Sequence, residues 1–464
     1  MSNSFLRKSI SSGLCLIAVL FQLPVSAQDD VMLVVTEALI VPLDWSEETP
    51  RLGYIVVGSD GRIQAMGSGE PPPSSAPVLN VGGKVVMPGF LSGHSHLGGS
   101  VSRGRAAGDW VTEWRLSGRG RRGSEGDTYA STLHGALDML FGGITTVYNY
   151  ASMGRNPASL DETLRAVIDA RGHYVFGTNI PDYHEELSQE ELIAVLRTFI
   201  DKVESTPGSE RILKLSMSSH AMRWTEDESR FEFEVLKMFP EFEMDMQMHY
   251  LEPPPNVPRT VYERSNFVWL EKYGILGPNL TFAHFVHPTE EILMDAVAAG
   301  ATMSWNPLSN ARLASGLTDV PRFRKLGLTV GMGIDGQGSA DIADPFQNMR
   351  VGLYGLRMRD QDPGVMSPYE VLHLHTIETA KAIRVADDVG SLEVGKYADF
   401  IVVDPNDPST GPVYDVYATL VFACSRANIT DVYVAGEPVI KDREFVHVDA
   451  RQFQKNLHYR LSRR

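Results

Sequence analysis

Cysteine is scarce in this sequence, since Cys15 and Cys424 are the only two among 464 residues. Two thiols offer no disulfide framework. Positive charge is also in short supply, with 42 lysines and arginines against 58 aspartates and glutamates and a formal net charge of −16. This balance argues against a general nucleic-acid-binding protein, which needs a clustered cationic surface. The 43 % apolar and 22 % charged residues are instead typical of a globular chain with a sizeable core.

Apolar runs of membrane length are missing as well. The run over residues 13–23 is too short to cross the roughly 30 Å hydrocarbon core of a bilayer as a helix. Arg7 and Lys8 precede it and Val25-Ser26-Ala27 follows it, which is the order of a cleavable signal peptide. We therefore expect residues 1–27 to be removed after Ala27, leaving a periplasmic or secreted protein with no membrane segment. A buried N-terminal strand or a membrane anchor is the alternative.

Two rhythms of apolar and polar residues divide the remaining chain. Residues 28–87 alternate apolar and polar positions around turns, which is typical of short antiparallel strands. Over residues 88–387, helix-period segments instead end in glycine, as at Gly300 and Gly327, and lead into short apolar runs typical of parallel strands. Repetition of that unit predicts an α/β fold, as a (β/α)₈ TIM-type barrel or a doubly wound sheet.

The short-strand pattern returns over residues 388–445, with apolar runs at 398–403, 413–422 and 429–440. We expect this segment to pair with the N-terminal one and form a small β-sandwich beside the barrel. Residues 446–464 are expected to form a polar, helix-like tail.

Metal-ligand side chains stand where predicted strands end. The apolar run 85–90 leads into His94-Ser95-His96, and residues i and i+2 of an extended backbone point to the same side. Three more apolar runs end at His249, His284 and Asp335. Because barrel enzymes build their sites at the carboxyl ends of strands, these positions predict three imidazoles and one carboxylate around a catalytic divalent ion. The alternative is four unrelated buried polar residues at loop starts.

Several motifs follow one another along the chain. They are Val86-Met87-Pro88-Gly89-Phe90, Gly93-His94-Ser95-His96, His249-x-x-Glu252, Ala283-His284-Phe285-Val286-His287, Trp305-Asn306-Pro307-Leu308-Ser309-Asn310, Gly333-Ile334-Asp335-Gly336 and Gly390–Asp399. In this order they resemble the amidohydrolase superfamily, in the branch of S-adenosylhomocysteine, guanine and cytosine deaminases and s-triazine hydrolases. The resemblance covers about residues 31–445 and implies a metal-dependent barrel with a flanking β-sandwich.

The resemblance also implies roles for the site residues. His94, His96, His249 and Asp335 would ligate one divalent ion, with zinc expected and iron as the alternative. Asp335 would also accept the proton of the attacking water.

Two further catalytic residues are implied. Glu252 would protonate a ring nitrogen and assist the leaving group, and His284 would polarise the substrate and stabilise developing charge. The alternative for Glu252 is a solvated loop carboxylate.

Four residues are candidates for binding substrate. His220 stands at the end of strand four, where related deaminases carry a histidine that contacts substrate, and Arg223 and Asn306 stand in the neighbouring pocket segments. Trp114 belongs to a segment that helps to close the active site in the family.

Two departures from the family pattern are expected in the pocket. Met222-Arg223 replaces a proline and an aromatic residue, and Trp305 replaces a histidine. Both weigh against the usual nucleoside or purine substrates. A cluster of arginines could recognise an anionic substrate, with an exposed basic face or a dimer contact as the alternative. Its members are Arg103, Arg105, Arg115, Arg119, Arg121 and Arg122.

The expected reaction is hydrolysis of a non-peptide carbon–nitrogen bond of a small molecule by a metal-bound hydroxide, with deamination of an amino-substituted heterocycle favoured. The same site could instead carry out dechlorination or cleave an amide or urea. A carboxylated Lys214 on strand four would indicate a binuclear amidase or peptidase, unless its amine only reaches solvent. A non-catalytic scaffold is the alternative from another class. The family suggests a homodimer.

Overall fold

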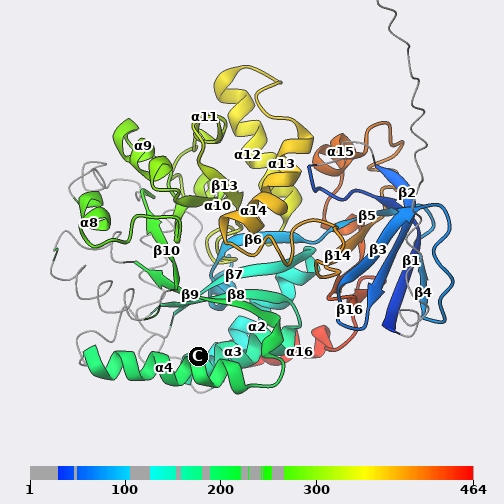
Figure 1. Cartoon of the computed structure of the whole chain (residues 1–464), viewed down its shortest axis with the longest axis horizontal. Helices are drawn as coiled ribbons and strands as arrows, with labels where there is room; N and C mark the ends of the chain where they lie inside the picture. The colour runs from blue at the N-terminus through cyan, green and yellow to red at the C-terminus, as the bar shows by residue number, and fades with distance from the viewer. Residues whose placement is uncertain are drawn as a thin grey trace, which may run out of the picture.

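The computed structural model is built around two sheets, a parallel barrel and a mixed sheet beside it (Figure 1). It describes residues 30–45, 50–104, 126–152, 158–179, 189–220, 228, 242, 244–252 and 266–462. The predicted signal peptide lies outside these residues. Among the described helices, none combines the length and apolar character that crossing a bilayer requires.

Eight parallel strands form the barrel, and each pairs with the next along the chain. The predicted (β/α)₈ architecture is therefore confirmed. Several strands, such as β10, are buried along their whole length, as expected for a parallel sheet that is covered on both faces. The strands are β6 (Phe90–Ser95), β7 (Ile144–Ser152), β8 (His173–Asn179), β9 (Ile212–Ser219), β10 (Asp245–Tyr250), β11 (Leu280–His284), β12 (Thr302–Trp305) and β13 (Thr329–Met332).

The barrel closes through a junction that we call the seam, formed by Ser92, His94 and Ser95 on one side and Ile334 and Asp335 on the other. A backbone bridge joins Ser95 to Asp335, and the Asp335 amide donates to the His94 carbonyl at 3.0 Å. The Ile334 amide donates to Ser92 Oγ at 2.9 Å. The first and last barrel strands are thus held together at their carboxyl ends.

Helices surround the barrel (Figure 1). Side-chain caps start several of them, as where Ser367 and Glu370 form a capping box. Gly300 and Gly327 follow α9 and α11 with φ of 74° and 101°, as the sequence predicted. The helices of this layer are α2 (Asp127–Phe141), α3 (Ala158–Ala170), α4 (Gln189–Ser205), α8 (Phe267–Lys272), α9 (Glu290–Ala298), α10 (Pro307–Arg312), α11 (Val320–Lys325), α12 (Pro345–Asp360), α13 (Pro368–Leu374) and α14 (Ile377–Ala382), with short 3-10 turns η2 (Leu97–Ser102) and η3 (Ser209–Arg211).

The mixed sheet corresponds to the predicted β-sandwich. Strand β14 of the C-terminal segment pairs antiparallel with β5 of the N-terminal segment, so the predicted pairing of the two segments is confirmed. The strands are β1 (Val31–Ile40), β2 (Arg51–Gly58), β3 (Ile63–Ser68), β4 (Val78–Asn80), β5 (Val85–Pro88), β14 (Phe400–Val403), β15 (Ile429–Val434), β16 (Glu437–Lys441) and β17 (Glu444–Phe445).

The sequence suggested one strand over residues 85–90, but the structure divides it at Gly89. The Gly89 amide donates to the Asp399 carbonyl beside the mixed sheet, whereas the next amide, Phe90, donates to Gly143 beside the barrel. A Cβ at position 89 would lie 2.1 Å from Thr145 Oγ1, so only glycine permits this crossing. The boundary between the two sheets thus falls at one residue.

Residues 413–422 were expected to form a strand, and the structure corrects this. They contain α15 (Val416–Ala418) and most of the π-helical turn η6 (Thr419–Ala423). The Asp415 carboxylate caps this segment by accepting from the Ala418 amide at 2.8 Å, and the Tyr417 ring packs 5.0 Å from Tyr369. Local capping and packing therefore outweigh the apolar pattern.

The predicted C-terminal tail is a helix, α16 (Ala450–Ser462), which follows the 3-10 turn η7 (Arg426–Asn428) and the last strands. Leu457 is 5 % exposed, so one side of α16 packs against the body of the protein.

Candidate active site

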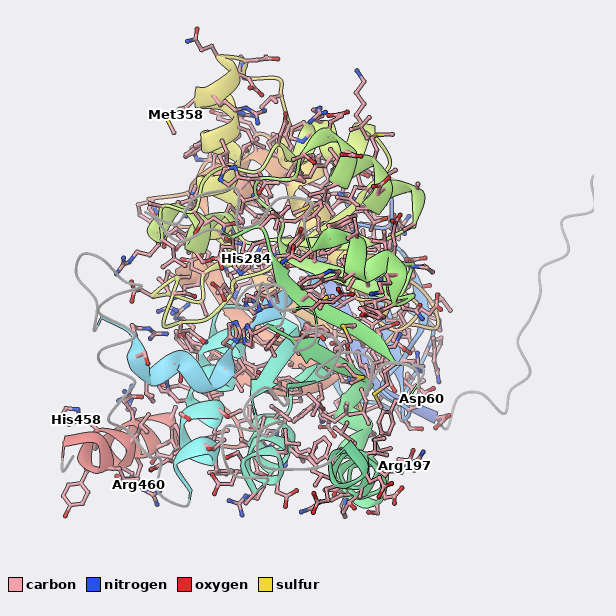
Figure 2. The ribbon with its side chains drawn as sticks, turned by 90° about the vertical axis from the view of Figure 1, so that its left-hand side faces the viewer. Asp60, Arg197, His284, Met358, His458 and Arg460 are labelled. Atoms are coloured by element: carbon pink, nitrogen blue, oxygen red, sulfur yellow. The ribbon has the colours of Figure 1, made fainter. Side chains whose placement is uncertain are left out.

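Four of the predicted site residues come from carboxyl ends of barrel strands. His94 lies in β6, His249 in β10, His284 ends β11, and Asp335 follows β13 by three residues. His96 stands one residue after β6. Figure 2 shows His284 in the interior of the molecule, in agreement with its complete burial. The barrel topology thus brings together residues separated by up to 241 positions, as His94 and Asp335 are in the seam.

The donor atoms of four of these side chains converge. His96 Nε2 and His249 Nε2 lie 3.1 Å apart, and packing of a protein core does not by itself require two imidazole nitrogens to be this close. Asp335 Oδ1 lies 3.4 Å from His94 Nε2 and 3.5 Å from His96 Nε2. Within the described residues, His94 Nε2 is buried without a hydrogen-bond partner. The donor atoms of His94, His96 and Asp335 lie within 4.8 Å of one another, and imidazole nitrogens with a carboxylate oxygen suit zinc or iron, so the residues fit a divalent ion.

The Asp335 carboxylate is held in its ionised form. Burial on its own would raise the pKa of Asp335, but the neighbouring imidazoles of His94, His284 and His96 keep that pKa well below its ordinary value. Ser339 Oγ donates to Asp335 Oδ2 at 2.7 Å and orients the carboxylate. Asp335 also has a φ of 64°, in the left-handed region that side chains usually avoid.

Glu252 and His284 form a second pair beside this cluster. Glu252 Oε1 lies 3.3 Å from His284 Nδ1, and the Glu252 side chain is 3 % exposed. This burial overturns the reading of Glu252 as a solvated loop carboxylate. The amide nitrogens of Asn306 and Asn310 lie 3.3 Å and 3.0 Å from the same His284 Nδ1. Asn306 therefore contacts His284 directly.

Of the other substrate-binding candidates, only His220 can be placed. It follows β9, is half-buried, and stacks on His249 with ring centroids 4.5 Å apart. Trp114 and Arg223 lie outside the described residues, as does Met222 and all of the arginine cluster except Arg103. The Arg103 guanidinium pairs with Asp138 of α2.

Trp305 does not belong to the pocket, contrary to our expectation. Successive residues of a strand face opposite sides, and Ser304 Oγ meets the Asn306 amide on the inner side at 3.2 Å. The Trp305 indole is fully buried and packs on α12, where a Cβ at Gly352 would lie 2.4 Å from the ring. One of the two departures that weighed against purine substrates is therefore a core packing difference.

The position of Lys214 also does not fit the alternative, a binuclear metal site that contains a carboxylated lysine. It is the third residue of β9, and its amine forms an ion pair with Asp245, the first residue of β10. His249 follows Asp245 by four residues on the same strand, which corresponds to about 13 Å. Lys214 thus belongs to the amino-terminal end of the barrel, opposite the cluster, and does not support a binuclear site.

Sequence reasoning missed residues that contact the cluster without being ligands. Gln247 precedes His249 by two residues and therefore faces the same side, and its Oε1 lies 2.6 Å from His94 Nδ1. Tyr150 of β7 places its ring 4.8 Å from the His249 ring. The spacing from His249 could have identified Gln247, whereas nothing in the sequence around Tyr150 indicates its position.

Comparison with known proteins gives both a family and a shared fold. The model of the amidohydrolase family matches residues 85–439. The chain is 26 % identical over 442 residues to the 5-methylthioadenosine/S-adenosylhomocysteine deaminase of Shouchella clausii, covering 93 % of this chain and 99 % of that protein.

Two solved structures share the architecture. An adenosine deaminase from Xanthomonas campestris with bound zinc has a TM-score of 0.82 and 23 % identity, over 93 % of this chain and 98 % of that one. The atrazine chlorohydrolase from Arthrobacter aurescens TC1 complexed with zinc has a TM-score of 0.77 and 19 % identity, over 92 % and 99 %.

Proposed function

This chain belongs to the amidohydrolase family and is a hydrolase, and from that premise we propose that it acts on a carbon–nitrogen bond other than a peptide bond and deaminates an amino-substituted heterocycle. The observation that carries the proposal is the buried Glu252–His284 pair next to the four converging donors of His94, His96, His249 and Asp335. A deaminase needs a proton donor beside a site that activates water, and this arrangement offers both.

The four converging residues would hold the divalent ion. When bound, the ion supplies a Lewis acid that makes water a nucleophile near neutral pH. The ionised Asp335 carboxylate, which Ser339 orients, accepts the proton that this water loses.

Glu252 and His284 act on the substrate. Glu252 protonates the ring nitrogen next to the carbon under attack, and its burial next to His284 excludes bulk water from that transfer. His284 donates a hydrogen bond to the oxygen that attacks this carbon, where charge develops in the transition state. The proton that Asp335 took from water passes to the amino group, the carbon–nitrogen bond breaks, and ammonia leaves. The ring keeps the oxygen of water as a carbonyl and the proton on its nitrogen, while the remaining hydroxyl proton returns to Glu252.

Aminopurine nucleosides are the first substrates that we propose. The relative of Shouchella clausii is named for two adenosine derivatives, and it matches this chain over 99 % of its own length. Trp305 no longer weighs against purines, because its indole lies on the α12 side of the sheet. The similarity of fold to an atrazine chlorohydrolase keeps dechlorination as the second candidate reaction.

Product analysis of the zinc-loaded protein tests the proposal. We expect ammonia release from an adenosine-type substrate, and loss of about 10²- to 10⁴-fold in kcat for Glu252→Gln, with unchanged zinc content. The matched control is Glu271→Gln, which changes an exposed glutamate of α8 and should keep full activity. Chloride release from a chlorotriazine without ammonia from any amino heterocycle would favour the second reaction. A fully active Glu252→Gln enzyme would contradict the acid–base role.

We further propose that the enzyme works outside the cytoplasm, on the support of the signal-peptide pattern in residues 1–27. Amino-terminal sequencing of the protein recovered from the periplasm or the medium should then begin at Gln28. Recovery of the full-length chain in the cytoplasm would contradict export.

A further inference from the structure

One buried side chain near the proposed metal centre has no assigned role. Gln247 is fully buried in β10, the fifth barrel strand. Its side chain crosses the barrel interior to the first strand, where it contacts both Gly93 and His94 of β6. A glutamine that joins opposite strands through the interior of a barrel needs an explanation, because burying an amide is costly unless both of its ends are hydrogen-bonded.

Both ends of the Gln247 amide are engaged. Nε2 donates to the Gly93 carbonyl at 2.8 Å, and Oε1 lies 2.6 Å from His94 Nδ1. A backbone carbonyl can only accept, so the NH₂ end of the amide must face Gly93 and the oxygen must face His94. An amide oxygen also only accepts, so His94 Nδ1 must carry a proton and donate it.

The consequence reaches the other nitrogen of the ring. A neutral imidazole carries one proton, so a protonated Nδ1 leaves Nε2 with its lone pair free. In His94 that Nε2 is the buried atom 3.4 Å from Asp335 Oδ1, in the cluster that fits a divalent ion. The opposite tautomer would place a proton where the ion belongs.

We propose that Gln247 is a positioning residue that selects the His94 tautomer able to bind the metal ion. The inference rests on the metal centre of the proposed function. It also bears on which residues form that centre, because His94 is a member of two overlapping groups of three donors, one with His96 and Asp335 and one with His249 and His284. Loss of the correct His94 tautomer would weaken either arrangement.

The tautomer and the zinc affinity are the two quantities to measure. In protein labelled with ¹⁵N-histidine and loaded with zinc, His94 Nδ1–H should give a downfield proton resonance that is slow to exchange and is absent in His94→Ala. Gln247→Leu should lose this resonance and bind zinc about 10- to 100-fold more weakly in competition with a chromophoric chelator.

Two further variants separate the amide oxygen from general packing. Gln247→Glu keeps an oxygen opposite His94 Nδ1, and its second oxygen donates to the Gly93 carbonyl when the carboxyl is protonated. At a pH where this buried carboxyl is neutral, we expect the variant to retain the resonance and a zinc affinity close to that of the unchanged protein. Gln337→Leu is the matched control: Gln337 is also fully buried and donates to a glycine carbonyl, that of Gly135 at 2.9 Å. This control should leave the His94 resonance and the zinc affinity unchanged.

Every outcome decides the proposal. It is overturned if Gln247→Leu keeps the resonance and the zinc affinity, or if folded Gln247→Glu loses both. Should Gln247→Leu not fold, the unbranched Gln247→Met is measured in its place. Neither readout depends on turnover, so a protein with the expected tautomer and no ammonia release would refute the proposed function and leave the role of Gln247 standing. If the unchanged protein binds no zinc, the resonance in the metal-free protein decides.

Discussion

Single residues set the chemistry of this site through polar contacts with fixed donor and acceptor roles. Asp335 is kept ionised by neighbouring imidazoles, and its second oxygen accepts from Ser339. Two site residues, His284 and Asp335, have positive φ values of 73° and 64°. Backbone strain of this kind costs about 1–3 kcal/mol for each residue and persists only where the surroundings enforce it. The residues that surround the site therefore determine its geometry as much as the candidate ligands do.

A second buried histidine network supports the seam. His375 Nδ1 donates to the Leu91 carbonyl at 2.8 Å, and His375 Nε2 accepts from the Asn348 amide at 3.0 Å. Asn348 Nδ2 also donates to the Gly333 carbonyl at 3.0 Å, two residues before Asp335. The His375 ring is therefore neutral, and its network links the first barrel strand to the end of the last one.

The charge state of His375 predicts a loss of stability in acid. Burial lowers the pKa of His375 to about 4, whereas the unfolded chain takes up this proton near its ordinary value of 6.5. The contribution of neutral His375 is therefore complete above pH 6.5 and is lost as the pH falls toward 4, by roughly 3 kcal/mol in all. Urea unfolding of the metal-free protein and of His375→Gln should show a larger stability difference at pH 7 than at pH 4.5. An equal difference at both pH values would contradict this.

Among the elements, β11 and the residues that follow it position His284 of the proposed catalytic pair. Phe285 follows His284 directly, has a φ of 44°, and donates its amide to the Tyr250 carbonyl at 3.0 Å. Its ring stacks on Phe282 with centroids 4.6 Å apart. This packing on the outer side of the barrel holds the strained turn that aims His284 inward.

Truncation of this aromatic contact should affect both stability and activity. We expect Phe285→Ala to lower the free energy of unfolding by about 3–5 kcal/mol, because it leaves a cavity in the core. It should also lower kcat, although Phe285 contacts no substrate, because His284 loses the support of its backbone. Urea unfolding and steady-state kinetics measure the two effects. Phe400→Ala removes a buried ring of β14 in the mixed sheet and should cost stability while sparing kcat. Equal loss of kcat in both variants would contradict the positioning role.

The sequence correctly predicted those elements for which the local residue pattern agrees with the conformation that the fold imposes. Helix ends at Gly300 and Gly327 were visible because glycine adopts the left-handed conformation that the turn needs. At the end of α3 the left-handed residue is instead Arg171, with φ of 64°, one position before Gly172. The helical turn at 416–423 was missed because its apolar run also fits a strand, and its cap and ring contacts are tertiary.

The candidate site was predictable in its ligand-type residues and not in their supports. His94, His249 and Asp335 stand at recognisable strand ends, which meet at one edge of a parallel barrel. The direction of the Trp305 side chain depends on where β12 starts in register, which the sequence does not specify. Gln247 acts across the barrel, and a contact between strands one and five has no local signature.

At the scale of the whole molecule, the proposed ion would connect the two ends of the barrel sheet. His94 belongs to the first strand and Asp335 follows the last, and they meet at the seam. The mixed sheet adds a second connection. Strand β5 precedes the barrel strands in the sequence, β14 follows them, and the two pair with each other. The homodimer suggested by the family stays a prediction, which light scattering of the purified protein can check.

Metal removal should therefore lower the stability of the entire fold. At free zinc about 1,000 times the dissociation constant, binding adds about 4 kcal/mol to the free energy of unfolding. Unfolding in zinc and in excess chelator should differ by that amount in the unchanged protein and should not differ in His94→Ala. His134→Ala, which changes a histidine of α2 that contacts Ser100, should retain the zinc effect. Identical unfolding curves with and without zinc would refute this coupling.

The position of the seam also determines when the site can come into existence. His94 is synthesised early and Asp335 more than two hundred residues later, so no partial chain that ends before residue 335 contains the full donor set. Closing so long a loop costs entropy that only the completed barrel repays. Capture of the proposed ion would therefore be a late event in folding and would distinguish complete molecules from truncated ones. Ion content per chain would then report how many copies have folded to completion.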